Sequence, residues 1–101
     1  MKQVVVLSAK AHQNQLSRIF EGLNIPVFSK IDIEGIKNEN QKIDVSNWFG
    51  SGKESDFSVM YFAYLEDAEA IKIIESIDSW KEKNEGYSSM HAYVSPVEMN
   101  V

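Results

Sequence analysis

The sequence predicts an α+β sandwich in which two helices cover one face of a four-stranded antiparallel sheet. Three observations predict it: two stretches with helical periodicity, four strand-like stretches, and their order βαββαβ along the chain. Two right-handed crossovers in that order give the ferredoxin-like arrangement, with the first and third strands at the centre of the sheet. The 101 residues fit one such domain, so we expect residues 1–101 to share a single core.

The first strand and the first helix follow from two apolar patterns near the N-terminus. Residues 3–7 form a short apolar run typical of a buried strand. The next apolar side chains recur at the spacing of one helix face, and they are Leu16, Ile19, Phe20 and Leu23. We expect Ser8 to cap this helix and Gly22 to end it.

The second strand is expected at an edge of the sheet. Residues 27–34 alternate between a largely apolar set and a more polar set, and the more polar set places Asp32 and Glu34 on one face. A charged face and a preceding proline, Pro26, are both typical of edge strands. Residues 35–56 then form a polar, glycine-containing stretch, which we expect to be a long flexible loop. Loops of this length are usually functional or disordered.

The third strand, residues 57–65, is apolar on both faces. One face carries Val59, Tyr61 and Ala63, and the other carries Met60, Phe62 and Tyr64. Two helices can cover only one side of the sheet, so we expect another copy of the chain to cover the second apolar face.

The second helix and the fourth strand complete the order. Glu66 and Asp67 place acid where a helix begins, and Lys81, Lys83 and Gly86 are typical of a helix end. The apolar stripe between them consists of Ala70, Ile73, Ile74, Ile77 and Trp80. Residues 90–96 alternate as a strand up to Pro96, and residues 97–101 allow a short extension.

Composition narrows the classes of function. The chain has no cysteine, which excludes disulfides and thiolate chemistry and agrees with a reducing compartment, so we expect a cytoplasmic protein. The formal net charge is -5 and Arg18 is the only arginine, so we expect no nucleic-acid partner. The third strand resembles an RNA-binding strand only at Phe57 and Phe62, because Val59 stands at a central stacking position. No apolar run approaches the roughly 18 residues of a membrane span, so no direct membrane insertion is expected.

Two motifs in residues 35–56 each allow two interpretations. Gly50, Ser51, Gly52 and Lys53 could offer backbone amides and an ammonium to an anion, or form an ordinary turn. The full phosphate-loop spacing is missing, and Glu54 stands where Ser or Thr would ligate magnesium. The adjacent aromatics Trp48 and Phe49 could anchor a partner, or fold back onto the core or a neighbouring subunit.

The titratable residues predict neither a metal site nor catalysis. His12 and His91 are the only histidines, and they lack the close spacing of a metal-ligand pair. Asp32 and Glu34 could act as acid and base, but no His, Cys or Ser partner accompanies them, so protection of a sheet edge is the simpler interpretation. We therefore expect the chain not to be an enzyme.

The chain as a whole resembles the PII-like signalling proteins, trimeric ferredoxin-like regulators related to the nitrogen regulatory protein PII. The resemblance rests on the opening strand Lys-Gln-Val-Val-Val-Leu, on Gly-Leu-Asn-Ile after the first helix, and on Asp-Ile-Glu-Gly leading into the long loop. Further cues are Asn-Trp-Phe at residues 47–49 and Ala-Tyr-Val-Ser-Pro-Val-Glu at residues 92–98. The resemblance implies that residues 35–56 correspond to the T-loop, which responds to effectors and docks on targets, often membrane transporters.

The chain also departs from this family. Classical members hold nucleotide phosphates with a glycine- and basic-rich segment after the second helix, whereas residues 84–89 here contain one glycine and no arginine. Residues 35–56 also lack the tyrosine that some members carry in the T-loop.

These observations together predict a non-enzymatic, homotrimeric regulator that binds a small effector, such as a nucleotide, at its subunit clefts. The candidate effector-binding residues are Gly35, Lys37, Gly50, Gly52 and Lys53, and the candidate partner-binding residues are Trp48 and Phe49. The target would be a membrane transporter or an enzyme. The alternative is a divalent-metal-responsive protein similar to the CutA-type proteins. An acylphosphatase-type enzyme would need an arginine in its first loop, whereas Arg18 falls inside the first helix.

Overall fold

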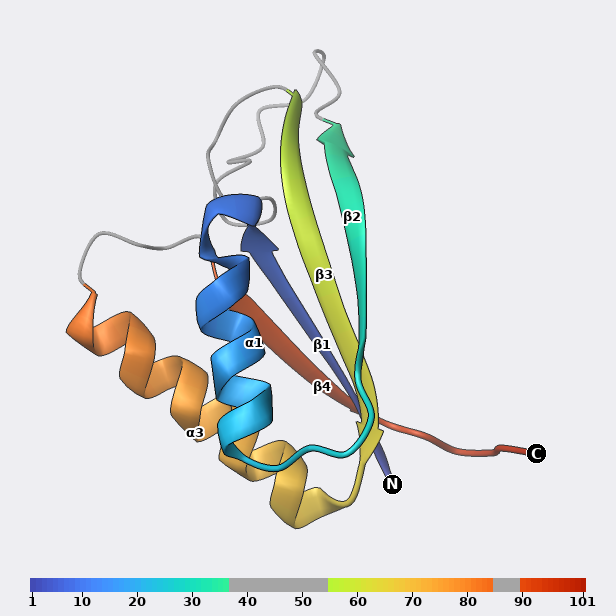
Figure 1. Cartoon of the computed structure of the whole chain (residues 1–101). Coiled ribbons are helices and arrows are strands. Elements are labelled where there is room, and N and C mark those ends of the chain that lie inside the picture. Colours follow the sequence, from blue (N-terminus) through green and yellow to red (C-terminus); the bar gives the residue numbers. More distant parts are fainter. Residues whose placement is uncertain (37–54, 85–89) are drawn as a thin grey trace.

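The computed structural model describes residues 1–36, 55–84 and 90–101, which form one antiparallel sheet with two helices on one face (Figure 1). The strands are β1 (Lys2–Ala9), β2 (Ser29–Ile36), β3 (Ser55–Leu65) and β4 (His91–Pro96). A 3-10 turn, η1 (Lys10–His12), precedes helix α1 (Gln13–Gly22), and helix α3 (Asp67–Lys83) follows β3. The strand order is β2-β3-β1-β4. The predicted ferredoxin-like fold is therefore confirmed, with the first and third strands at the centre.

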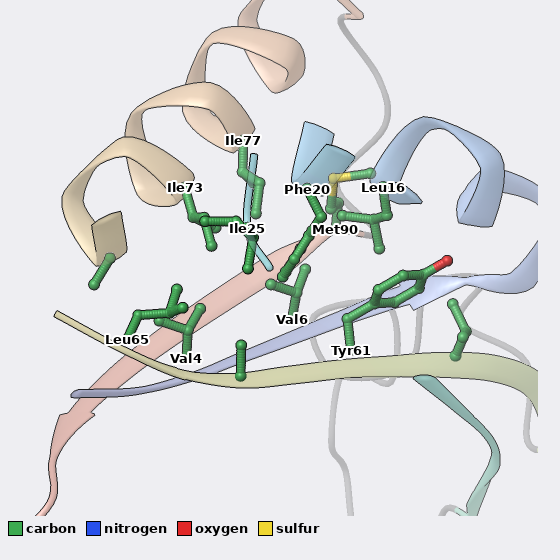
Figure 2. Close-up of a cluster of buried hydrophobic side chains, with 13 residues drawn as sticks. Val4, Val6, Leu16, Phe20, Ile25, Tyr61, Leu65, Ile73, Ile77 and Met90 are labelled. Atoms are coloured by element: carbon green, nitrogen blue, oxygen red, sulfur yellow. The ribbon is translucent and has the colours of Figure 1, made fainter. Parts of the chain in front are cut away.

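The core lies between the sheet and the two helices. Figure 2 shows β1 and β3 side chains meeting those of α1 and α3. The buried apolar residues are Val4, Val6, Leu16, Phe20, Ile25, Val59, Tyr61, Ala63, Leu65, Ala70, Ile73, Ile77 and Met90. Their alternation along β1 and β3 matches the two-residue period of a strand, because every second side chain points to the helices.

Among the residues that the structure describes, Tyr61 is the largest fully buried side chain, and its hydroxyl is satisfied inside the core. The hydroxyl donates to the Gln13 carbonyl oxygen at 2.9 Å and lies 2.7 Å from the Ser17 hydroxyl. The Tyr61 ring also packs against Phe20, with ring centroids 5.6 Å apart, and against Phe28 at 6.0 Å. These contacts fix the first turn of α1 over β3, because a buried phenol without partners would be costly.

The helix ends follow the predictions only in part. Ser8 does not cap α1: it is fully buried in β1, its hydroxyl donates to the Ala9 carbonyl at 3.0 Å, and η1 separates it from the helix. His12 takes the N-cap position, but its side chain forms no capping hydrogen bond to α1, whereas α1 ends at Gly22 as predicted. Helix α3 begins with a capping box formed by Glu66 and Glu69.

The strand boundaries on either side of the predicted loop differ from the predicted ones. β2 continues through Gly35 and Ile36, and β3 begins at Ser55, so the predicted loop loses residues at both ends. Glycine and several polar residues have a low intrinsic preference for strands, but the pairing of β2 with β3 extends both strands through them. Residues 97–101 form no strand, although the Val97 amide donates to the Met1 carbonyl at 3.2 Å.

Candidate functional site

One end of the sheet, which we call the loop end, gathers the strand ends that adjoin η1, residues 37–54 and residues 85–89. β1 ends there at Ala9, β2 ends at Ile36, β3 begins at Ser55 and β4 begins at His91. The register supports this grouping, since Ile36 pairs with Ser55 and His91 pairs with Leu7 near the end of β1. Figure 1 shows that the connections from α1 to β2 and from β3 to α3 lie at the other end of the sheet. The predicted effector loop is therefore joined to the loop end.

Gly35 is the one predicted effector-binding residue within the described part of the chain. It is buried in β2, paired with Asp56 on β3, at the position where the strand leads into the predicted loop. Lys37, Gly50, Gly52 and Lys53 lie outside the described residues, as do Trp48 and Phe49. Their roles stay predictions.

Two polar contacts tie β2 to the segment that starts α1. The Lys10 ammonium lies 2.9 Å from an Asp32 carboxylate oxygen, and the Lys30 ammonium donates to the Gln13 side-chain oxygen at 3.1 Å. Sequence reasoning considered Asp32 as an edge-protecting or acid–base group but missed Lys10, because the two residues are far apart in sequence. Both partners of the ion pair are about half exposed, so its contribution to stability is small.

The sheet face opposite the helices, which we call the open face, is largely apolar at its centre. Val5 lies between Phe62 and Tyr93 in the register, and Met60 lies between Leu7 and Ile31. Both described helices, α1 and α3, lie on the other face of the sheet (Figure 1). Tyr64 is 54% exposed, and Ile31 and Tyr93 are each 45% exposed. A contiguous apolar surface on central strands is typical of an interaction site.

The open face becomes polar away from the loop end. The Gln3 side-chain amide donates to the Tyr64 hydroxyl at 3.3 Å, and the Ser95 hydroxyl donates to the Gln3 side-chain oxygen at 3.4 Å. These contacts link β3, β1 and β4. They give the apolar surface a polar border, as interfaces commonly have.

Within residues 1–36, 55–84 and 90–101, no three His, Cys, Asp or Glu side chains gather closely enough to hold a metal ion. His12 instead packs edge-on against Trp80, with ring centroids 5.5 Å apart. In the same part of the chain, no helix has the length and apolar character needed to cross a membrane.

Several solved structures have a fold similar to that of this chain. CPII from Thiomonas intermedia K12, a nitrogen regulatory PII-like protein bound to ADP, AMP and bicarbonate, matches with a TM-score of 0.68 and 10% identity. That match covers 99% of this chain and 92% of CPII. A PII-like signalling protein from Thermus thermophilus matches with a TM-score of 0.63 and 14% identity over 93% of this chain and 82% of its own. The apo form of CPII matches with a TM-score of 0.63, 13% identity and coverages of 93% and 85%.

These matches establish a shared fold. No family model matches the chain, and no curated protein matches it in sequence. The fold of the PII-like proteins, expected from the sequence, is confirmed over nearly the whole chain.

Proposed function

We propose that this chain is a PII-like regulator that assembles as a homotrimer, binds a small effector at subunit clefts and controls a target through residues 35–56. The observation that carries the proposal is the apolar open face on the central strands β1 and β3, in a fold shared with PII-like proteins. An isolated domain would leave this face in contact with water, whereas an assembly of copies would cover it.

The open face supports the assembly step. Phe62 and Val5 pair with each other in the register of the two central strands, so an apolar surface lies at the middle of the sheet rather than at its border. Contact with another copy would remove this surface from water, and burial of apolar area favours association. Three copies joined through heterologous contacts form a closed ring, which leaves no such face exposed.

The loop end supports the effector step. Gly35 lies where β2 leads into residues 37–54. Lys37 and Lys53 lie near the two ends of that stretch in the sequence. Lysine ammonium groups and glycine-rich backbone suit an anionic effector such as a nucleotide. CPII, which has the same fold, is bound to ADP and AMP. We therefore assign Gly35, Lys37, Gly50, Gly52 and Lys53 to the effector and Trp48 and Phe49 to the target, a membrane transporter or an enzyme.

A thermal-shift experiment tests effector binding, because a ligand that binds only the folded protein raises its apparent stability. ADP and AMP should raise the melting temperature of the wild type, and Lys37→Ala and Lys53→Ala should each reduce the shift. Lys72→Ala is a matched control, since Lys72 is exposed on α3 away from the loop end. A response to zinc or copper with none to the nucleotides would contradict the proposal and favour the divalent-metal alternative.

Tryptophan fluorescence tests whether residues 35–56 transmit the bound state. The chain has two tryptophans, Trp48 and Trp80, so Trp80→Phe leaves Trp48 as the single reporter. Binding of ADP should change the emission of Trp48 if effector binding reorders its surroundings. If ADP binds and the emission of Trp48 does not change, residues 35–56 do not transmit the bound state, and their assignment as the output segment is wrong.

A further inference from the structure

A concave region lies between α3 and the outer strand β4. Its volume is about 270 Å³, and its apolar lining comes from Ala70, Ile71, Ile74 and Val94. Its charged lining comes from Lys2, Asp67 and Glu75. We call this region the α3–β4 groove. It shares no residue with the predicted effector loop or with the open face.

The groove stands open because α3 covers the edge of the sheet incompletely. Ala70, Ile73 and Ile77 of α3 are buried in the core, whereas Ile71 on the flank of the helix is 56% exposed. Val94 is 39% exposed, although its neighbour in the register, Val4, is fully buried. An apolar ligand in the groove would cover Ile71 and Val94, and removal of apolar area from water favours binding.

The charged groups divide the groove into two ends. Lys2 pairs in register with Leu65, the last residue of β3, and Asp67 begins α3 two residues later. An ammonium and a carboxylate therefore belong to the same end, whereas Glu75 lies eight residues along the helix, about 12 Å away. Within the described part of the chain, neither Lys2 nor Asp67 forms an ion pair. This end of the groove thus offers one ammonium and one carboxylate, neither in an ion pair with another described residue, beside an apolar surface.

We propose that the α3–β4 groove binds an α-amino acid with an apolar side chain. The ligand carboxylate pairs with Lys2, the ligand ammonium pairs with Asp67, and the side chain packs against Ile71, Ile74 and Val94. A purely anionic amphiphile would meet the Asp67 and Glu75 carboxylates, and a purely cationic one would meet the Lys2 ammonium. A zwitterion satisfies both charges at one end. Since an apolar cavity of roughly 150 Å³ holds benzene, this larger groove accommodates a leucine-sized ligand.

This proposal goes beyond the function assigned to the loop end. The groove is on the helix side of the β4 edge, so an amino acid bound there would be a second ligand with its own recognition chemistry. Because the groove is open to solvent and small, we expect a dissociation constant on the order of 1 mM.

Titration of the isotope-labelled protein with L-leucine, followed by NMR, tests the proposal. The amides of Ala70, Ile71 and Val94 should shift saturably. Two analogues isolate the charges: 4-methylpentanoate keeps the carboxylate without the ammonium, and isoamylamine keeps an ammonium without the carboxylate. Each should bind about fivefold or more weakly than L-leucine, because one groove charge is left unpaired in each complex.

Substitutions of the groove residues test which side chains contact the ligand. Lys2→Gln and Asp67→Asn should each weaken L-leucine binding about fivefold or more, and Lys2→Gln should leave isoamylamine binding unchanged or stronger. Ile71→Ser should weaken every ligand that carries the apolar side chain. Val27→Ser is the matched control, since Val27 is 75% exposed and does not line the groove. A melting curve of each variant confirms that it folds.

Four outcomes would overturn the proposal. The first is the absence of saturable shifts up to about 50 mM L-leucine, well above the expected dissociation constant. The second is isoamylamine or 4-methylpentanoate binding as tightly as L-leucine. The third is a response at the loop end without one at Ala70, Ile71 and Val94. The fourth is movement of these amides on dilution of the protein, which would show that another copy covers the groove. None of these outcomes bears on nucleotide binding, whose test relies on Lys37 and Lys53.

Discussion

Tyr61 and Phe62 are neighbours in β3, yet they face different surroundings. Tyr61 is fully buried beneath α1, and its hydroxyl hydrogen-bonds within the core. Phe62 lies on the open face, beside Val5, where no described helix covers it. The two faces of β3 are similar in apolar content, so the difference comes from where the helices pack. An apolar side chain on the open face stabilises the protein fully only when another molecule removes it from water.

Truncation on the helix-covered face should have the largest effect. Phe20→Ala should lower the free energy of unfolding by about 3–5 kcal/mol, because a fully buried aromatic leaves a cavity that the core cannot close. Denaturant unfolding measures the loss. A loss below about 1 kcal/mol would mean that the helix-covered face tolerates truncation as a surface does.

A charge on the open face should break the assembly rather than the subunit. Phe62→Lys should destabilise the proposed trimer by about 3 kcal/mol or more, because an unpaired ammonium would be buried in an apolar contact. Sedimentation should then show a species near the 11.5 kDa of one chain, or aggregates. Ile71→Lys, on the α3 flank, is the control and should keep the wild-type assembly. A wild-type chain that already sediments as a monomer at micromolar concentration would refute the assignment of the open face to self-association.

Removal of one hydroxyl on each side of β3 gives a finer comparison. Tyr61→Phe should cost about 1–2 kcal/mol, since the buried groups at Ser17 and Gln13 lose their partner. Tyr64→Phe removes an exposed hydroxyl that accepts from Gln3, and its effect on the unfolded–folded equilibrium should stay within about 0.5 kcal/mol. Equal losses in the two variants would show that both hydroxyls are equally shielded from water.

The smallest effect is expected at the exposed ion pair that ties β2 to η1. Asp32→Ala should cost less than about 1 kcal/mol, because both partners are about half exposed and solvent screens their attraction. The loss should shrink further at high salt. If the loss persists unchanged in 1 M salt, which reduces the Debye length to about 3 Å, a contact other than the ion pair is responsible.

Periodicity predicted the elements and the fold because it reflects burial directly. Most of the predicted α3 stripe and one of the two alternating faces of β3 lie in the core; these residues are Ala70, Ile73, Ile77, Val59, Tyr61 and Ala63. The helix start at Ser8 was wrong, since β1 continues through Ser8 while paired with β3. Pairing with a neighbouring strand depends on residues far away in sequence, so local capping preferences do not reveal it.

The candidate sites were predictable to different degrees. The open face followed from the alternation of residues 57–65, although the sequence did not tell which face the helices cover. Gly35 was predicted as the first residue of the loop, whereas pairing with Asp56 places it inside β2. The Lys10–Asp32 pair and the α3–β4 groove had no local signal, because Lys2, Asp67 and Val94 meet only once the sheet has formed.

The sequence by itself determined the order of the elements, the two-sided apolar character of β3 and the absence of thiol chemistry, since each depends on residue type and spacing alone. Tertiary structure decided which face of β3 became the core, how far β2 and β3 extend and where the α3–β4 groove opens. The physical reason is that burial and cross-strand pairing depend on which elements pack together. Two helices bury one face of four strands, and the position of α3 sets how much of β4 is left exposed.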